Sequence, residues 1–153
     1  MRTMSGDLIA LGRQGHFDVI AHGCNCMHVM GAGLAAQIRR HFPEAYAADL
    51  ATQLGDEKKL GTCSFAVVAT GTTKLHVVNA YTQFGFGGGA VQVDYDAVRR
   101  CMAWLRSNYA GRRIGLPQIG AGLGGGDWGR ISGIVADELR DQDVTIVHFA
   151  GNT

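Results

Sequence analysis

The stretch Leu116-Pro117-Gln118-Ile119-Gly120-Ala121-Gly122-Leu123-Gly124-Gly125-Gly126-Asp127-Trp128 decides how the chain can fold. The apolar residues 114–116 predict the end of a buried strand before it, and apolar residues at helical spacing from 131 to 139 predict a helix after it. Asp127 stands where a helix N-cap is expected. A strand, a loop nearly without side chains and a helix start form a cradle for an anion, because free backbone N–H groups face it.

The number of glycines in this loop favours a ligand over a simple turn. A tight turn from strand to helix needs one or two glycines, whereas residues 120–126 contain five glycines in seven positions. We therefore expect a phosphate- or pyrophosphate-binding loop, with a purely structural loop as the alternative.

The composition is that of a globular chain with unusually many glycines. A length of 153 residues suits one domain, 1–153, with one sizeable core. With 46% hydrophobic residues and a net charge of +1, the chain is not disordered, and nothing in its charge calls for nucleic acid as a partner.

Its 23 glycines are about twice the usual share. Outside the opening stretch they gather at 31–33 and at Gly85, Gly87, Gly88 and Gly89, which suggests a backbone shaped around a ligand.

The four cysteines, Cys24, Cys26, Cys63 and Cys101, are too few for a disulfide framework in a chain of this size. Cys24 and Cys26 could begin a zinc site, but no second close pair follows and zinc needs about four ligands, so we expect no metal. We expect small buried side chains instead. The sequence shows neither a signal peptide nor an apolar run of transmembrane length, and a cytoplasmic location without membrane contact is expected.

Strand and helix patterns alternate through most of the chain. The periodicity predicts strands at 6–11, 17–21, 63–69, 75–81 and 144–149, and helices over 34–42, from Pro43 onward and after Asp94. This alternation predicts an α/β fold, namely a three-layer α/β/α sandwich with a central mixed sheet.

In such sheets a ligand binds beyond the strand ends. Two glycine loops, 31–33 and 120–126, lie at junctions of strand and helix, and two loops suit a diphosphate gripped from both sides, as in ADP-ribose or a dinucleotide. Neither loop has the lysine of a nucleotide-triphosphate P-loop, and the second misses the dinucleotide fingerprint by one residue at its third glycine.

The order of these motifs resembles a macrodomain over nearly the whole chain. It runs from Gly6-Asp7-Leu8 through Asn25 and Gly31-Ala32-Gly33 to Ile119-Gly120-Ala121-Gly122-Leu123. The sequence is most similar to the subgroup containing the yeast-type ADP-ribose 1''-phosphate phosphatase and the terminal ADP-ribose glycohydrolase. That similarity is carried by His22-Gly23-Cys24-Asn25-Cys26, by 33–35 leading to Phe42-Pro43, by 116–119 and by Trp128.

The resemblance implies a role for each matching residue. Asp7 would accept a hydrogen bond from the adenine amino group, Asn25 would sit beside the distal ribose, and the glycine loops would hold the diphosphate. Without the resemblance, Asp7 could equally be a surface acid on a strand edge and Asn25 a turn asparagine. Phe149 is a weaker candidate for stacking on adenine, and a core position is the expected alternative. The ligand-binding residues expected are Asp7, Leu8, Asn25, Gly31, Ala32, Gly33, Thr82, Ile119, Gly120, Ala121, Gly122, Leu123 and Gly124.

This sequence differs from the glycohydrolase pattern of the subgroup at two positions, and these differences distinguish between the two activities. The glycohydrolase type has a lysine where this chain has Gln83, and an acid where it has Gly124. Glutamine cannot form a Schiff base and glycine cannot act as acid or base, while Asp127 lies three residues too late to replace the acid. The resemblance thus disfavours that mechanism.

His22 falls on the histidine of the phosphatase type. Histidine titrates near neutrality and could activate a water or protonate a leaving oxygen, although a histidine capping a buried strand has the same pattern. The leading hypothesis is a hydrolase with His22 as catalytic residue that removes phosphate from ADP-ribose 1''-phosphate, without a cofactor. The alternatives are a non-catalytic reader of ADP-ribose and a hydrolase of an ADP-ribosyl bond on protein or nucleic acid.

Overall fold

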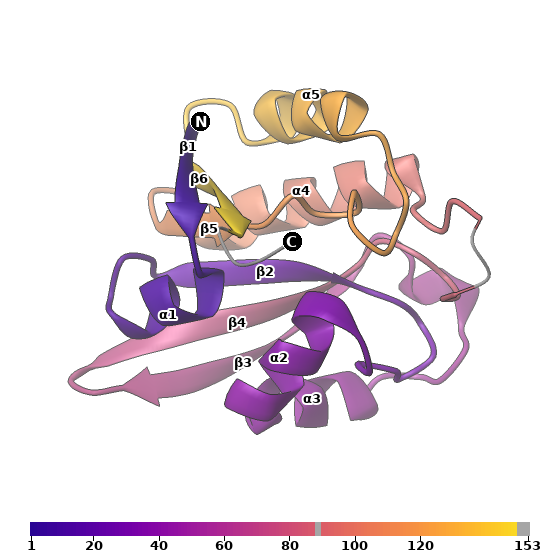
Figure 1. Cartoon of the computed structure of the whole chain (residues 1–153), viewed down its shortest axis with the longest axis horizontal. Helices are drawn as coiled ribbons and strands as arrows, with labels where there is room; N and C mark the ends of the chain where they lie inside the picture. The colour runs from indigo at the N-terminus through magenta and orange to yellow at the C-terminus, as the bar shows by residue number, and fades with distance from the viewer. Residues whose placement is uncertain (88–89, 150–153) are drawn as a thin grey trace.

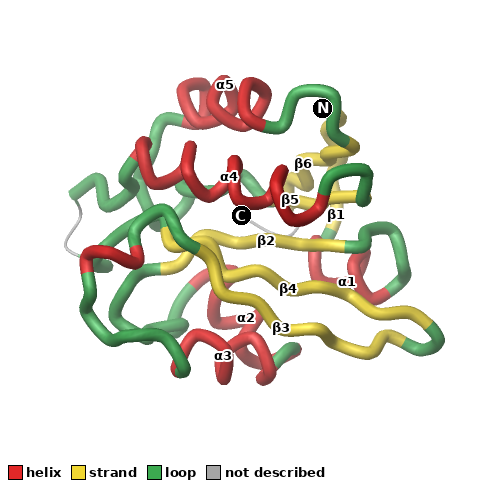
Figure 2. Tube along the Cα trace, turned by 180° about the vertical axis from the view of Figure 1, so that it is seen from behind, coloured by secondary structure: helices red, strands yellow, loops and turns green. Residues whose placement is uncertain are grey.

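The computed structural model describes residues 1–87 and 90–149, and within them six strands form one sheet (Figures 1 and 2). The strand order is β1-β6-β5-β2-β4-β3. Neighbouring strands are parallel except β3 and β4, which form an antiparallel hairpin, so the expected mixed sheet is confirmed. The strands are β1 (Arg2–Gly6), β2 (Val19–Cys24), β3 (Cys63–Thr70), β4 (Thr73–Tyr81), β5 (Arg113–Leu116) and β6 (Asp143–Phe149).

Helices cover both faces of the sheet, and each face has its own apolar core. Helices α1 (Leu8–Arg13), α2 (Gly33–His41) and α3 (Pro43–Leu50) pack on one face, and α4 (Tyr95–Tyr109) and α5 (Trp128–Glu138) on the other (Figure 1). A short 3-10 helix, Glu57–Lys59, precedes β3. The three-layer α/β/α sandwich predicted from the sequence is confirmed. No helix of the described part of the chain has the length and apolarity to cross a membrane.

Strand β2 is the central element for the site, because it pairs in parallel with both β4 and β5. Its residues are nearly all buried, as expected for a strand covered by helices on both faces. Parallel pairing brings the carboxyl ends of the three strands to the same edge of the sheet. The segments that follow them, beginning at Asn25, Thr82 and Pro117, therefore start close together.

The prediction of a strand over 6–11 is wrong. The first strand ends at Gly6, and Leu8–Arg13 is helix α1. The Asp7 carboxylate accepts hydrogen bonds from the backbone N–H groups of Ile9 (2.9 Å) and Ala10 (3.1 Å), which makes it the N-cap of this helix. The preceding strand is mostly exposed and lacks an apolar pattern, so periodicity could not detect it.

Most other local predictions are confirmed. The predicted strands 63–69 and 75–81 correspond to β3 and β4, Pro43 begins α3, and Asp94 and Asp127 are the N-caps of α4 and α5. The four cysteines are free, and all but Cys63 are buried. Gly88, Gly89 and residues 150–153 lie outside the described residues, so the glycine cluster at 85–89 and the domain 1–153 are described only in part.

Position 115 of β5 has to be a glycine, because the side chain of Phe17 fills the space beside it. A Cβ added to Gly115 would lie 2.6 Å from the ring of Phe17, which is buried. We expect Gly115→Ala to lower the free energy of unfolding by about 1–3 kcal/mol, because the ring has no space to move into. Gly133→Ala is the control, since a Cβ there meets nothing within 4 Å, and alanine should stabilise this helix by about 0.5–1 kcal/mol. Urea unfolding measures both, and equal stability of the two variants would contradict this packing.

Candidate functional site

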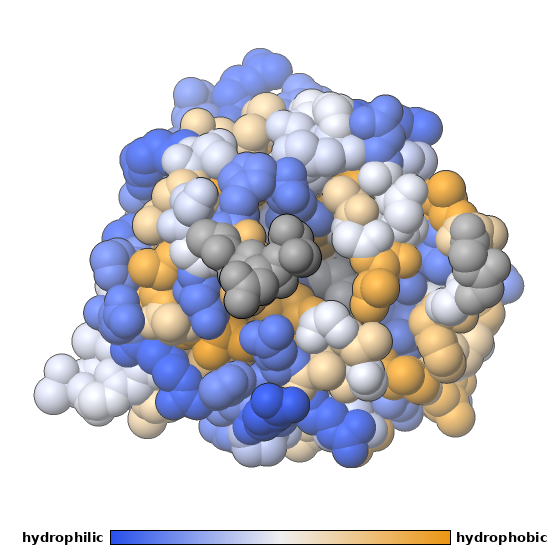
Figure 3. Space-filling view, in the orientation of Figure 1, coloured by the Kyte–Doolittle hydropathy of each residue, from blue (hydrophilic) through white to orange (hydrophobic). Residues whose placement is uncertain are grey.

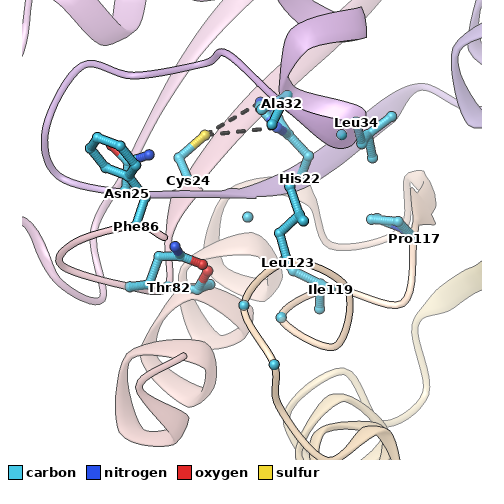
Figure 4. A pocket seen from close by; sticks show the side chains of 18 of the residues that line it. His22, Cys24, Asn25, Ala32, Leu34, Thr82, Phe86, Pro117, Ile119 and Leu123 are labelled. Carbon is cyan, nitrogen blue, oxygen red and sulfur yellow. Dashed lines mark hydrogen bonds between the residues drawn. The ribbon is translucent and has the colours of Figure 1, made fainter. Parts of the chain in front are cut away.

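A cavity of about 940 Å³ lies at the carboxyl ends of β2, β4 and β5 (Figure 4). Its wall consists of the end of β2, the two glycine loops and the segments that follow β4 and β5. Figure 3 shows this face of the molecule hollowed, with apolar residues around the hollow. The predicted site residues that line the cavity are His22, Asn25, Gly31, Ala32, Gly33, Thr82, Ile119, Gly120, Gly122, Leu123 and Gly124.

The first glycine loop presents the start of helix α2 to the cavity. Ala32 occupies the N-cap position, and its side chain cannot cap the helix. The backbone N–H groups of Gly33, Leu34 and Ala35 have no hydrogen-bond partner among the described residues. A helix start with unbonded N–H groups carries a partial positive charge, so this end of α2 attracts an anion.

The second glycine loop presents a similar row of donors from the opposite wall. Hydrogen bonds from Gly126 N to Gly120 O (2.8 Å) and from Gly125 N to Gly122 O (3.0 Å) fold the loop back on itself. The N–H groups of Gly122, Leu123 and Gly124 are left without a partner in the part of the chain that is described. Three successive free N–H groups in a turn form a concave donor site for anions.

Most glycines of the second loop are required by the loop itself. A Cβ on Gly120 would lie 2.8 Å from Val93, and a Cβ on Gly124 or Gly126 would lie 2.8 Å from the Gly120 carbonyl oxygen. Only at Gly122 would an added Cβ meet nothing within 4 Å. The glycine excess therefore serves mainly the loop conformation, and Gly122 is the position open to a ligand.

The two loops also touch each other. The Leu123 side chain lies 3.0 Å from the position that a Cβ on Gly33 would occupy. The same side chain is 72% exposed, so it bridges the loops at the surface. The two rows of free N–H groups thus belong to one site.

The cavity is uncharged along its described lining, which includes no Asp, Glu, Lys or Arg. Its titratable side chains are His22 and Cys24. Burial raises the pKa of the Cys24 thiol well above its usual value, so the thiol stays protonated and is a poor nucleophile. An anionic ligand would be held by backbone N–H groups, including those at the start of α2.

His22 is almost fully buried at the end of β2, with 1% of its surface exposed. Its Nε2 lies 2.7 Å from Oδ1 of Asn79, and burial lowers the pKa of the imidazole to about 4. The expected titration near neutrality is therefore wrong, because an imidazolium in this position loses its hydration. At pH 7 the ring is neutral, and it can accept a hydrogen bond but cannot protonate a leaving group.

Asn25 shapes the turn that leads into the first loop. Its Oδ1 accepts hydrogen bonds from the N–H groups of Met27 (2.9 Å) and Val29 (3.4 Å), and its Nδ2 donates to the Val29 carbonyl oxygen (2.8 Å). This is the turn role that the sequence left open. The side chain also lines the cavity, where its second amide hydrogen has no partner among the described residues.

Thr82 brings an unsatisfied hydroxyl to the cavity. Its Oγ1 is buried and has no hydrogen-bond partner within residues 1–87 and 90–149. It lies 2.8 Å from the position that a Cβ on Gly23 would occupy, at the floor of the cavity. A buried hydroxyl without a partner is costly, so a ligand or water oxygen is expected to bind there.

The two departures from the glycohydrolase pattern lie side by side in the structure. Oε1 of Gln83 lies 3.0 Å from the position of a Cβ on Gly124, and Nε2 of Gln83 donates to the Gly85 carbonyl oxygen (2.8 Å). Asp127 is exposed, caps α5 through Gly129 N (2.9 Å) and does not line the cavity. It does not replace the missing acid.

Three predicted ligand residues do not line the cavity, namely Asp7, Leu8 and Ala121. Asp7 caps α1, Leu8 belongs to the core and Ala121 packs partly buried beneath its loop. The expectation that Phe149 lies in the core is wrong, because the side chain is 63% exposed. It pairs in register with Gly6, so it stands at the strand ends beside Asp7.

The sequence reasoning missed several residues of the lining. Phe86 lines the cavity and is 55% exposed, and its place inside the second glycine cluster was the available signal. Leu34 and Ala35 contribute through their position in the first turn of α2, which the helix pattern could have indicated. Cys24 and Gln118 had no distinguishing signal.

The sequence model of the Macro domain family matches residues 21–135. The chain belongs to this family. This macrodomain is 38% identical over 156 residues to an uncharacterized 17.5 kDa protein in the tk-vs intergenic region of Enterobacteria phage T4, with 97% of this chain and 96% of that protein covered.

Solved structures agree with the fold of this macrodomain. A protein of unknown function from Bacteroides thetaiotaomicron is 28% identical, with a TM-score of 0.74 over 97% of each chain. Thermosipho africanus DarTG, solved in complex with ADP-ribose, is 17% identical, with a TM-score of 0.78 over 99% of this chain and 42% of that chain. At this identity the second likeness shows the fold alone.

The burial of His22 predicts a pH-dependent stability. Between pH 6.5 and about pH 4 the imidazole of His22 is protonated in the unfolded chain but stays neutral in the folded protein. The free energy of unfolding therefore falls as the pH is lowered. From pH 7 to pH 4 this contribution amounts to about 3 kcal/mol. His22→Gln, which can still donate to Asn79, should lose that part of the pH dependence. Urea unfolding at both pH values measures it, and equal acid sensitivity of the two proteins would refute the assignment.

Proposed function

We propose that this macrodomain binds ADP-ribose and removes the terminal phosphate from ADP-ribose 1''-phosphate. The observation that carries the binding is the pair of unbonded N–H rows, at Gly33 to Ala35 and at Gly122 to Gly124, on opposite walls of one cavity. Two adjacent phosphates need donors on both sides, and an uncharged site supplies them through helix ends and loop amides. The volume of about 940 Å³ lies within the range of small-molecule sites, about 300–1,000 Å³.

We assign the remaining predicted residues to the two ends of such a ligand, with Asn25 and Thr82 in the lining of the cavity and Asp7 and Phe149 outside it. The Asn25 amide and the Thr82 hydroxyl, at the ends of β2 and β4, would contact the distal ribose and its phosphate. At the other end, one oxygen of Asp7 already accepts from Ile9 and Ala10, and the second is free among the described residues to accept from the adenine amino group. The exposed ring of Phe149 stands next to it and would stack on adenine.

The proposed reaction is hydrolysis of a phosphate monoester. The oxygen of a water attacks phosphorus, and the bond between phosphorus and the ribose oxygen breaks. One proton of the water stays with the released inorganic phosphate, and the other ends on the ribose oxygen, which becomes the hydroxyl of ADP-ribose. The unbonded N–H groups stabilise the charge on the phosphate oxygens. A neutral His22 accepts a hydrogen bond from the attacking water and orients it, which suits a ring that stays unprotonated at pH 7.

The substrate is a small molecule, and the proposed reaction takes place in a single macrodomain over 1–153. The reaction needs no cofactor, no metal, no nucleic acid and no membrane. The four free cysteines fit the reducing cytoplasm that we expected from the sequence.

A non-catalytic reader of ADP-ribose is the second candidate. It is favoured by one observation, namely that the described lining offers only a neutral His22 and a protonated Cys24 as titratable groups. Hydrolysis of an ADP-ribosyl bond is less well supported, because Gln83 and Gly124 lack the chemistry that the glycohydrolase pattern places there.

Binding is tested at Gly122, where a side chain would enter open space. Gly122→Val should leave the fold intact and weaken ADP-ribose binding by about 100-fold or more, roughly 2.7 kcal/mol, because the methyl groups block the approach to the loop amides. Gly133→Val on α5 is the control and should bind like the wild type. Isothermal titration calorimetry measures both. Absence of binding to the wild type at millimolar ADP-ribose would remove the proposed function.

Catalysis is tested at His22 by following phosphate release from ADP-ribose 1''-phosphate. His22→Gln should lower kcat by about 100-fold while ADP-ribose affinity changes little. In the wild type, kcat/KM should fall only as the pH approaches about 4, where the imidazole of the free enzyme becomes protonated, and should show no step near pH 6.5. A wild type that binds ADP-ribose and releases no phosphate would establish the reader instead.

A further inference from the structure

A chain of buried hydrogen bonds runs behind the cavity from His22 to a carboxylate on α3. Nε2 of His22 lies 2.7 Å from Oδ1 of Asn79, and Nδ2 of Asn79 lies 3.0 Å from Oγ of Ser64. The Ser64 hydroxyl lies 2.8 Å from the hydroxyl of Tyr81, which donates to Oδ1 of Asp49 at 2.7 Å. Asn79, Tyr81 and Asp49 are each at most 1% exposed, and the chain joins β2, β4, β3 and α3.

The Ala45 carbonyl oxygen, which can only accept, determines which atom donates and which accepts in the hydrogen bonds of Asn79. Nδ2 of Asn79 lies 2.9 Å from the Ala45 carbonyl oxygen, which can only accept, so the amide NH₂ must face Ala45 and Ser64. The amide oxygen then faces His22, and it too can only accept. The proton of His22 is therefore on Nε2. A flipped amide would set its oxygen against the Ala45 carbonyl oxygen and lose that bond.

The rest of the chain agrees with this direction. Ser64 accepts from Asn79 and gives its own proton to Tyr81, and Tyr81 gives its proton to Asp49. Each hydroxyl donates once and accepts once, and the bonds polarise one another in the same sense inside a low-dielectric interior. The Cys24 thiol lies 3.5 Å from Nε2 and 3.7 Å from Nδ1, so it does not distinguish the two nitrogens.

We infer that the Asp49–Tyr81–Ser64–Asn79 chain locks His22 in one neutral tautomer, with its proton on Nε2 and its lone pair on Nδ1. Nδ1 is then the only ring nitrogen that can accept a hydrogen bond, either from the protonated Cys24 thiol at 3.7 Å or from a ligand or water. The lock itself is independent of the reaction. Its effect on catalysis rests on the proposed function. There, Asn79 and Tyr81 are positioning residues, because they orient His22, whose Nδ1 accepts a hydrogen bond from the attacking water.

The same arrangement accounts for the neutral state of the ring. The titratable groups around His22 are Cys24 on β2, Asp49 on α3 and Tyr81 on β4. The negative charge of Asp49 favours the imidazolium, but burial outweighs it. Burial also raises the pKa of Tyr81 beyond its ordinary range, so its hydroxyl keeps the proton that it gives to Asp49.

Long-range ¹H–¹⁵N spectra of histidine-labelled protein test the lock without reference to activity. At pH 7 the wild type should show His22 with one protonated and one bare nitrogen, the proton on Nε2, unchanged down to about pH 5. A proton on Nδ1, or a fast mixture of tautomers, would overturn the inference.

Two variants extend this test to the chain. Asn79→Asp keeps the shape but places a carboxylate against Nε2, so His22 should become protonated at a higher pH than in the wild type. Asn108→Asp, on the exposed side of α4, adds the same charge and should leave the His22 signals unchanged. Tyr81→Phe removes only the hydroxyl and should shift the His22 nitrogen signals. Unchanged His22 signals in Tyr81→Phe would show that Tyr81 and Asp49 do not contribute to the hydrogen-bond chain that holds His22.

The kinetic readout separates the lock from the proposed function. With ADP-ribose 1''-phosphate, Tyr81→Phe should lower kcat by about tenfold, short of the roughly 100-fold expected for loss of His22, with KM nearly unchanged. If the spectra show the Nε2–H tautomer and the wild type releases no phosphate, the tautomer lock is supported and the phosphatase activity is contradicted. If phosphate is released and His22 is protonated on Nδ1, the phosphatase activity is supported and the tautomer lock is contradicted.

Discussion

The parallel pairing of β2 with both β4 and β5 is the constraint on which the site depends. It brings three carboxyl strand ends to one edge of the sheet, and each end continues into a segment that the cavity uses. The start of α2, the segment after Tyr81 and the glycine loop before α5 would otherwise be far apart along the chain. The sheet thus places two rows of backbone N–H groups across one cavity.

The site holds its chemistry in the backbone more than in side chains. With no charged residue in the described lining, the attraction for an anion comes from the peptide dipoles at the start of α2 and from the unbonded N–H groups of the second glycine loop. Such donors are fixed by the fold and need no reorganisation when a ligand binds. They also recognise phosphate oxygens without selecting what is attached to them, so discrimination between ligands falls to the groups at the two ends of the cavity.

Burial gives His22 a role different from that of an exposed histidine. Loss of hydration keeps the ring neutral, and a hydrogen-bonded partner on β4 orients it. A neutral, oriented imidazole is a hydrogen-bond acceptor of fixed direction. The cost of burying Asn79, Tyr81 and Asp49 is offset because each polar atom in the chain between them has a partner.

The sequence by itself determined the features that depend on local chemistry. The α/β alternation, the N-caps Asp94 and Asp127 and the two glycine loops could be predicted, because periodicity, capping and turn preferences act over a few residues. Membership of the macrodomain family was predicted differently, from the resemblance of the order of its motifs to that family. The first helix was missed because Asp7 begins it immediately after an exposed strand.

Only the tertiary structure decided which glycine of the second loop has open space beside it and in what state His22 exists. Gly120 and Gly122 look alike in the sequence, but one packs against Val93 from another segment and the other faces open space. The pKa and tautomer of His22 depend on Asn79, which lies 57 residues away, and on burial under α3. Such properties arise from contacts between distant segments, and no local pattern encodes them.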